Sequence, residues 1–154
     1  MSELRPFPKI SRRADQRFAA PTSSSRYVAT GSFSDGDFGL FESALAPGAN
    51  GPGPHYHQHF SESFYLLEGS LAVLTDDAPI LAEAGDFIYV PRESLHGFKN
   101  ASTESVARFL ILFTPGIARE QYFEGLIELQ GRGASVEEID AFARFHDQVN
   151  VRGI

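Results

Sequence analysis

Turn signals recur at short intervals through the middle of the chain, and this spacing limits the fold more than any other feature. Between positions 26 and 113, short apolar stretches alternate with clusters of glycine, proline, aspartate and serine, which are SDGD (34–37), APGANGPGP (46–54), EGS (68–70), TDDAP (75–79), AEAGD (82–86) and PRES (91–94). Apolar runs of this length between turns are typical of β-strands. The pattern predicts about seven or eight antiparallel strands in an all-β sandwich or small barrel, because closing the sheet removes its exposed edges.

The pattern changes after TPG (114–116), where apolar residues recur at helical spacing, namely Tyr122, Phe123, Leu126 and Ile127. Gly131 or Gly133 supplies a stop signal, and Ser135 with Glu138 forms a capping box for a second helix. One stripe of that helix is predicted to carry Ile139, Phe142, His146 and Val149. We expect the two helices to cover the barrel or to contact a partner subunit, with His146 in a packing or capping role.

These boundaries divide the chain into three predicted parts: an N-terminal arm (1–25), a β-barrel (26–114) and a C-terminal helical extension (115–154). The arm carries five basic residues, Arg5, Lys9, Arg12, Arg13 and Arg17, without sustained periodicity. Such a segment is either solvated or lies over a partner subunit.

Composition narrows the function. The formal net charge of -7 disfavours nucleic acids and anionic membranes as partners and leaves small molecules as the expected ligands. The chain has no cysteine, so any metal site must use nitrogen and oxygen ligands, and a reducing cytoplasm is the expected compartment. No apolar run approaches the roughly 20 residues of a membrane span, and the first residues lack the apolar core of a secretory signal.

Three of the five histidines fall between positions 55 and 59. His55 and His57 are two residues apart on an extended segment, so their side chains leave the same face. After a short connection, the alternation of the next strand places Glu62 and Phe64 on one face, from which Glu62 can reach the same cavity. A His-x-His pair alone is weak evidence of a metal site, and the carboxylate strengthens it.

Residues 51–69 and 85–100 resemble the two motifs of the cupin superfamily, and the first resembles the single-barrel subgroup called quercetin-dioxygenase-like. The first motif is matched in register by His55, His57, Glu62 and Gly69, and the second by Gly85, Pro91, His96 and Asn100. Two positions depart from the family pattern, Ala49 and Glu93, which stand where the family usually has glycine. A non-glycine residue at 93 predicts a turn that avoids positive φ or one that is slightly strained.

The resemblance implies that His55, His57, Glu62 and His96 bind one metal ion inside the barrel. Three imidazoles and one carboxylate suit divalent Fe, Mn, Ni, Co or Zn, and an octahedral ion would keep two open positions. The alternative is a barrel that retains the motifs without a metal. By the same resemblance we expect a homodimer.

The activity implied by the resemblance is that of a dioxygenase acting on a small aromatic or enolisable substrate, with Glu62 as both ligand and general base. Phe64 and Phe98 are candidate substrate-contacting residues, although ordinary core packing also explains them. His59 is placed in a loop at the barrel mouth, where it contacts either substrate or solvent. Two alternatives remain: a metal-dependent isomerase or cyclase, and a non-catalytic barrel that binds a small molecule in the presence of a metal.

Overall fold

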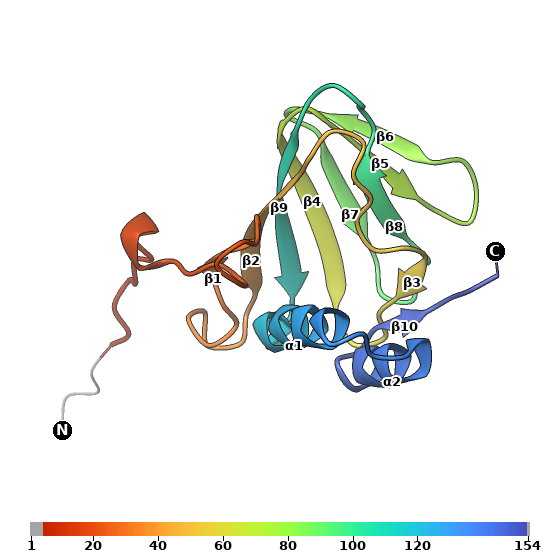
Figure 1. Cartoon of the computed structure of the whole chain (residues 1–154). Coiled ribbons are helices and arrows are strands. Elements are labelled where there is room, and N and C mark those ends of the chain that lie inside the picture. The colour runs from red at the N-terminus through yellow and green to blue at the C-terminus, as the bar shows by residue number, and fades with distance from the viewer. Residues whose placement is uncertain (1–4, 154) are drawn as a thin grey trace.

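The computed structural model describes residues 5–153, and its central part is an antiparallel β-barrel (Figure 1). Nine strands lie between positions 26 and 114: β1 (Arg26–Ala29), β2 (Gly39–Leu45), β3 (His55–Tyr56), β4 (Ser61–Glu68), β5 (Ser70–Leu74), β6 (Ile80–Glu83), β7 (Phe87–Val90), β8 (Gly97–Asn100) and β9 (Ala107–Thr114). The number exceeds the seven or eight expected from the sequence by the two-residue strand β3. The all-β prediction for this region is confirmed.

The strands form two main antiparallel sheets. One has the order β1-β2-β9-β4-β7 and the other the order β6-β5-β8. Phe98 of β8 packs against Phe64 of β4 and Phe109 of β9, with ring centroids 5.1 and 5.5 Å apart, so aromatic side chains join the sheets across the interior. Strand β9 shows the period of two that a half-buried strand requires, because its buried residues alternate with partly exposed ones along its whole length.

Two helices, α1 (Arg119–Gly131) and α2 (Val136–Phe145), lie at one end of the barrel (Figure 1). The predicted capping box is present, since Glu138 N–H donates to Ser135 Oγ and Ser135 N–H donates to Glu138 Oε2. Gly133, at a φ of 70°, ends α1. On α1, Ile127 is 40% exposed and so contributes little to the covering face.

The predicted stripe on the second helix is wrong at Val149, which lies in strand β10 (Val149–Asn150) and pairs with β3. The helix ends earlier because Asp147 adopts a φ of 58°. The amides of Asp147 and Gln148 then donate to the carbonyls of Arg144 and Ala143, which is the hydrogen-bond pattern of a Schellman motif. This left-handed residue turns the chain back toward the barrel.

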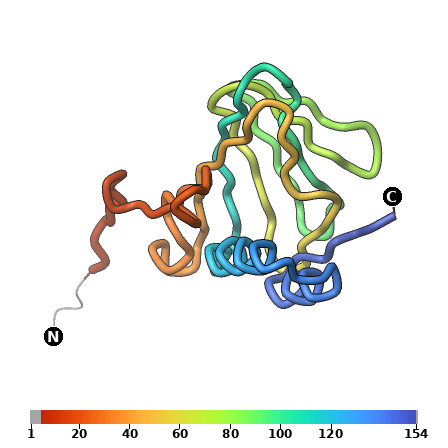
Figure 2. Tube along the Cα trace, viewed as in Figure 1, coloured from red at the N-terminus to blue at the C-terminus, as the bar shows by residue number. Residues whose placement is uncertain are grey.

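The segment before β1 leads away from the barrel and contains a 3-10 turn, η1 (Arg13–Asp15) (Figures 1 and 2). Two of its basic residues form ion pairs within the chain, Lys9 with Asp35 at 2.7 Å and Arg17 with Glu124 at 2.8 Å. Residues 1–4 of the predicted arm lie outside the described residues. Within residues 5–153, none of the helices has the length and apolarity needed to cross a bilayer. The three-part division of the chain, the homodimer and the compartment stay predictions.

Candidate metal centre

Four side chains that the sequence predicted as metal ligands converge inside the barrel. His55 lies in β3, His57 one residue beyond it, Glu62 in β4 and His96 immediately before β8. Each is at most 5% exposed, and one ligand atom from each lies within 4.8 Å of the others. The backbones of His55 and His96 exchange hydrogen bonds of 2.8 and 2.9 Å, so the β3 and β8 segments hold these two histidines together.

Hydrogen bonds at the outer ring nitrogens orient all three imidazoles. Nδ1 of His55 lies 2.8 Å from the carbonyl oxygen of Gly53, Nδ1 of His57 lies 2.7 Å from that of Asp147, and Nδ1 of His96 lies 3.0 Å from that of Ser94. A carbonyl oxygen only accepts, so each Nδ1 carries a proton and the Nε2 of each ring faces the cluster. The ring nitrogens left free to bind a metal therefore belong to the buried cluster, an arrangement that is common around metal-bound histidine.

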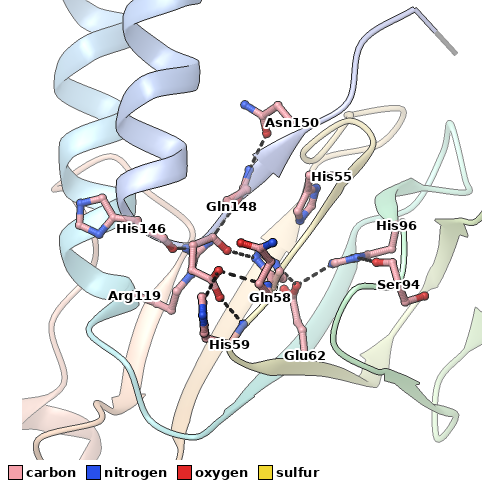
Figure 3. Close-up of polar contacts among 12 residues, drawn as sticks. His55, Gln58, His59, Glu62, Ser94, His96, Arg119, His146, Gln148 and Asn150 are labelled. Carbon is pink, nitrogen blue, oxygen red and sulfur yellow. Dashed lines mark hydrogen bonds and ion pairs between the residues drawn. The ribbon is translucent and has the colours of Figure 1, made fainter.

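Glu62 is the acceptor at the centre of the cluster. Its Oε2 lies 3.1 Å from Nε2 of His57 and 2.8 Å from Nε2 of His96 (Figure 3). Burial raises the pKa of Glu62, but the hydrogen bonds from the two histidines outweigh burial and hold the pKa well below its usual range. Glu62 is therefore ionised at neutral pH and available as an anionic ligand.

Two histidines of the cluster, His55 and His96, differ in proton affinity. Burial lowers the pKa of His55 to about 3, because the charged imidazolium is poorly solvated. Burial also lowers the pKa of His96, but the hydrogen bond to Glu62 and the charge of Glu62 outweigh it and raise that pKa above the ordinary value. His55 is a neutral nitrogen ligand at neutral pH, whereas His96 shares a proton with Glu62 that a metal ion would displace.

The donor set fits a divalent transition ion. Atoms bound to one ion at about 2.1 Å lie at most about 4.2 Å apart, so the observed spread of 4.8 Å requires only a small inward adjustment of the side chains. Three imidazole nitrogens and one carboxylate oxygen suit Fe, Mn, Co, Ni or Zn, and the set does not choose among them. The described residues thus provide a buried site that can hold a metal ion.

The turn before His96 is strained at the position where the family motif has glycine. Glu93 adopts a φ of 65°, which confirms the strained alternative of the two offered by the sequence. Its amide donates to the carbonyl of His57 at 2.7 Å. The turn that leads to His96 is therefore hydrogen-bonded to the backbone of His57.

Residues 119–150, which we call the C-terminal cover, fasten to the histidine segment through Asp147. Its carboxylate accepts from the amides of Gln58 and His59 at 3.1 and 2.7 Å and contacts Nδ1 of His59 at 2.9 Å. Its carbonyl accepts from His57, as described above. Asp147 thus holds the cover against the barrel and orients one proposed ligand, a role that the sequence analysis missed.

The cover also places Arg119, at the start of α1, at the mouth of the barrel. The side chain is 3% exposed, its Nη1 donates to the carbonyl of His146 at 3.0 Å and its Nη2 donates to Oε1 of Gln148 at 3.0 Å. Its guanidinium stacks on the ring of Tyr122 at 4.1 Å. Burial lowers the pKa of Arg119, although the side chain stays charged because its ordinary value is so high. Sequence analysis also missed this residue, since an arginine at the start of a helix gives no signal of burial.

A cavity of about 70 Å³ lies between the cluster and the cover, lined by residues that include His55, Glu62, Phe98, Arg119 and Gln148. Phe98 is therefore one of the residues that line this cavity, and its contact with a substrate stays a prediction. The structure does not bring the other two predicted substrate-contacting residues to this lining.

Phe64 is fully buried against Phe98 and Phe109, in the position of a core residue. The His59 side chain is 78% exposed and turned to Asp147. His146 ends α2 and packs on Phe142 at 4.6 Å, as expected for a capping and packing residue.

An outer hollow of about 190 Å³ adjoins this cavity. The two spaces share four lining residues, Pro52, Tyr122, Leu126 and Gln148. These side chains separate the inner cavity from the surface, so a ligand that enters from this side must displace some of them.

Comparisons with known proteins agree with this architecture. The family described as the cupin domain matches residues 41–113, which contain all four cluster residues. Quercetin 2,3-dioxygenase of Bacillus subtilis (strain 168) is 35% identical over 74 residues, a match that spans 48% of this chain and only 22% of the relative. The chain therefore matches about a fifth of that enzyme's length.

Two solved structures share the fold. The polyketide cyclase RemF from Streptomyces resistomycificus superposes with a TM-score of 0.57 at 22% identity, covering 70% of this chain and 80% of that one. A cupin-superfamily sugar phosphate isomerase from Silicibacter pomeroyi has a TM-score of 0.51 at 26% identity, covering 59% of each chain. Residues 41–113 are thus similar to the cupin domain in sequence, and the two-sheet barrel that contains them has the cupin fold.

Proposed function

We propose that this protein is a metal-dependent oxidoreductase of the dioxygenase type that acts on a small enolisable substrate. The observation that carries the proposal is the buried set of three imidazole nitrogens and one carboxylate oxygen beside a small cavity. His55, His57, Glu62 and His96 would hold the ion. A bound divalent ion would act as a Lewis acid toward an enol oxygen and, where redox-active, as an electron route to dioxygen.

Glu62 is proposed to accept the hydroxyl proton of the substrate. Its carboxylate lines the cavity and is ionised, so it has the position and the charge of a general base. The low pKa of Glu62 also makes it a weak base. It would therefore deprotonate only an acidified hydroxyl, such as an enol whose oxygen is polarised by a cation, and this limits the chemistry to enolisable or phenolic substrates.

The size of the cavity favours an enolisable substrate over an aromatic one. A volume of about 70 Å³ accommodates about five water-sized groups. A phenol with any substituent exceeds this, whereas a small hydroxy-carbonyl compound does not. Phe98 would then exclude water from the reacting carbon.

The match to quercetin 2,3-dioxygenase supports oxygen chemistry, because it exceeds the identity of the structural matches reported above. A second candidate is an isomerase or cyclase that uses the same site without oxygen. It is favoured by the 26% identity to the sugar phosphate isomerase. In that reaction Glu62 would move a proton between two atoms of the substrate.

Oxygen uptake separates the two candidates. The protein is loaded anaerobically with Fe(II) or Mn(II), mixed with a panel of small 2-oxo and 3-oxo compounds, and followed with an oxygen electrode and by mass spectrometry. We expect oxygen consumption equal to product formation, and its loss in Glu62→Gln. The matched control is Glu68→Gln on the same strand, where the side chain is 63% exposed. Product formed at the same rate without oxygen would overturn the oxidoreductase and support the isomerase.

A further inference from the structure

Arg119 has one nitrogen that the protein leaves unpaired. Nη1 and Nη2 each donate one hydrogen bond to the C-terminal cover, but Nε has no hydrogen-bond partner among residues 5–153. Buried arginine nitrogens normally donate, because an unpaired N–H that is removed from water is costly. The side chain is nevertheless held in one orientation, since its two bonds and the ring of Tyr122 hold the guanidinium plane.

The unpaired nitrogen belongs to a residue that lines the inner cavity together with His55 and Glu62. Figure 3 shows Arg119 and Gln148 on the side of the helices, and Glu62 and His96 on the side of the strands. A molecule in the cavity therefore lies between a guanidinium on one side and the candidate metal centre on the other.

The charges around the cavity call for an anion. Glu62 and Asp147 are the carboxylates that act on Arg119. Asp147 already accepts hydrogen bonds from Gln58 and His59. Once Glu62 binds a divalent ion, its charge is compensated by that ion. Among residues 5–153, Asp147 is then the carboxylate that still acts on Arg119, and the two form no ion pair. An anion in the cavity would stabilise this buried cation.

We propose that Arg119 binds the carboxylate of the substrate through Nε, and that the substrate class is small enolisable carboxylic acids. The inference deepens the proposed function and rests on it for the identity of the anion as substrate. A carboxylate at Arg119 directs the remainder of a short acid toward Glu62, which is where its enol hydroxyl must lie. An arginine suits this role better than a lysine, because its planar guanidinium presents directional donors to a carboxylate.

The test uses the Zn(II)-loaded protein, which is diamagnetic and redox-inert. ¹⁵N-labelled protein is titrated with acetate and, separately, with neutral acetamide of similar size, while the Nε–H resonances of the arginines are followed by NMR. We expect the Arg119 Nε–H resonance to shift with acetate and not with acetamide. In Arg119→Gln, acetate affinity should fall about ten- to hundredfold, the range for a hydrogen bond to a charged group. Arg132→Gln, which removes a 53% exposed arginine, is the matched control and should bind acetate normally.

The outcomes separate this inference from the proposed function. Metal content is measured on every sample, and a wild-type protein that holds no metal would overturn the metal centre. The same acetate titration without metal still reports on Arg119. An Arg119 Nε–H resonance that does not shift with acetate would overturn the anion site even with the metal bound. Equal acetate affinity in wild type and Arg119→Gln would do the same. If Arg119→Gln does not fold, Arg119→Lys keeps the charge, and the wild-type resonance alone decides the result.

Discussion

The strand side of the cavity and its C-terminal cover enclose the same space but are built in different ways. On the strand side, His55, His57 and His96 are oriented by short hydrogen bonds to backbone carbonyls. The Nε2 atoms of His57 and His96 contact Glu62. The cover instead contributes one buried cation, Arg119, and closes the mouth. The strand side thus carries the proposed metal ligands, and the cover carries the residue proposed to select the substrate.

The two sides are nevertheless coupled at a single point. His57 is the one proposed ligand whose Nδ1 is bonded to the cover, through the carbonyl of Asp147, whereas His55 and His96 bond to residues two positions away in their own segments. Opening the cover would therefore free His57 and leave the other two histidines oriented. This difference gives the predictions below, from the largest expected effect to the smallest.

The first prediction concerns the stability of the metal-free protein in acid. Burial lowers the pKa of His55 from 6.5 to about 3 in the folded state, so below pH 6.5 the unfolded chain binds a proton that the folded chain does not. Stability is then lost as the pH falls from 6.5 to about 3, at about 1.4 kcal/mol per pH unit, or about 5 kcal/mol in total. Urea unfolding of wild type and His55→Gln at several pH values measures this, and parallel pH profiles would contradict it.

His96 should act in the opposite direction above pH 6.5. Its raised pKa means that the folded metal-free protein keeps a proton that the unfolded chain loses, so this contribution is present below pH 6.5 and is lost as the pH rises through the folded pKa. Metal loading should remove both effects, because the ion takes the place of the proton. A metal-free sample that is least stable near pH 6.5 would show that the two histidines are not buried as described.

The second prediction removes one proposed ligand from the strand side. His96→Ala deletes a nitrogen donor whose place no other buried donor in the cluster can take, so metal affinity should fall at least about a hundredfold. Metal analysis after dialysis against a competing chelator gives the occupancy. His59→Ala is the control, because that side chain is exposed and lies outside the cluster. Full occupancy in His96→Ala would exclude His96 as a ligand.

The third prediction loosens the cover without touching the cluster. Asp147→Ala removes three hydrogen bonds to Gln58 and His59 and should cost about 2 kcal/mol of stability and about tenfold in metal affinity, the latter through the orientation of His57. Asp147→Asn keeps one acceptor oxygen and tolerates the φ of 58°, so its losses should be smaller. Unchanged metal affinity in Asp147→Ala would show that the strand side is independent of its cover.

The sequence predicted these two sides to different extents for a physical reason. His55, His57 and Glu62 lie close together in the chain, and strand alternation alone places their side chains on shared faces. His96 was predicted as the fourth ligand from the spacing of the second cupin motif. Asp147 reaches the site because α2 ends in a left-handed turn and β10 returns to β3, and the same turn supplies the partners of Arg119, His146 and Gln148. This long-range pairing leaves no local pattern. The same turn moved Val149 from the expected helix stripe into a strand.

The last prediction concerns the strained turn on the strand side. Glu93 at a φ of 65° carries a steric cost that glycine avoids, so Glu93→Gly should stabilise the protein, and the greater freedom of glycine in the unfolded chain should limit the gain to about 0.5 kcal/mol. Thermal unfolding of Glu93→Gly beside Glu93→Ala separates the two terms, because alanine keeps the strain and loses only the side chain. A Glu93→Gly protein that is less stable than wild type would show that the exposed Glu93 carboxylate stabilises the fold by more than the strain of its backbone costs. Metal affinity should be unchanged in both variants, because the backbone amide of residue 93 can donate its hydrogen bond to the carbonyl of His57 whichever side chain it carries.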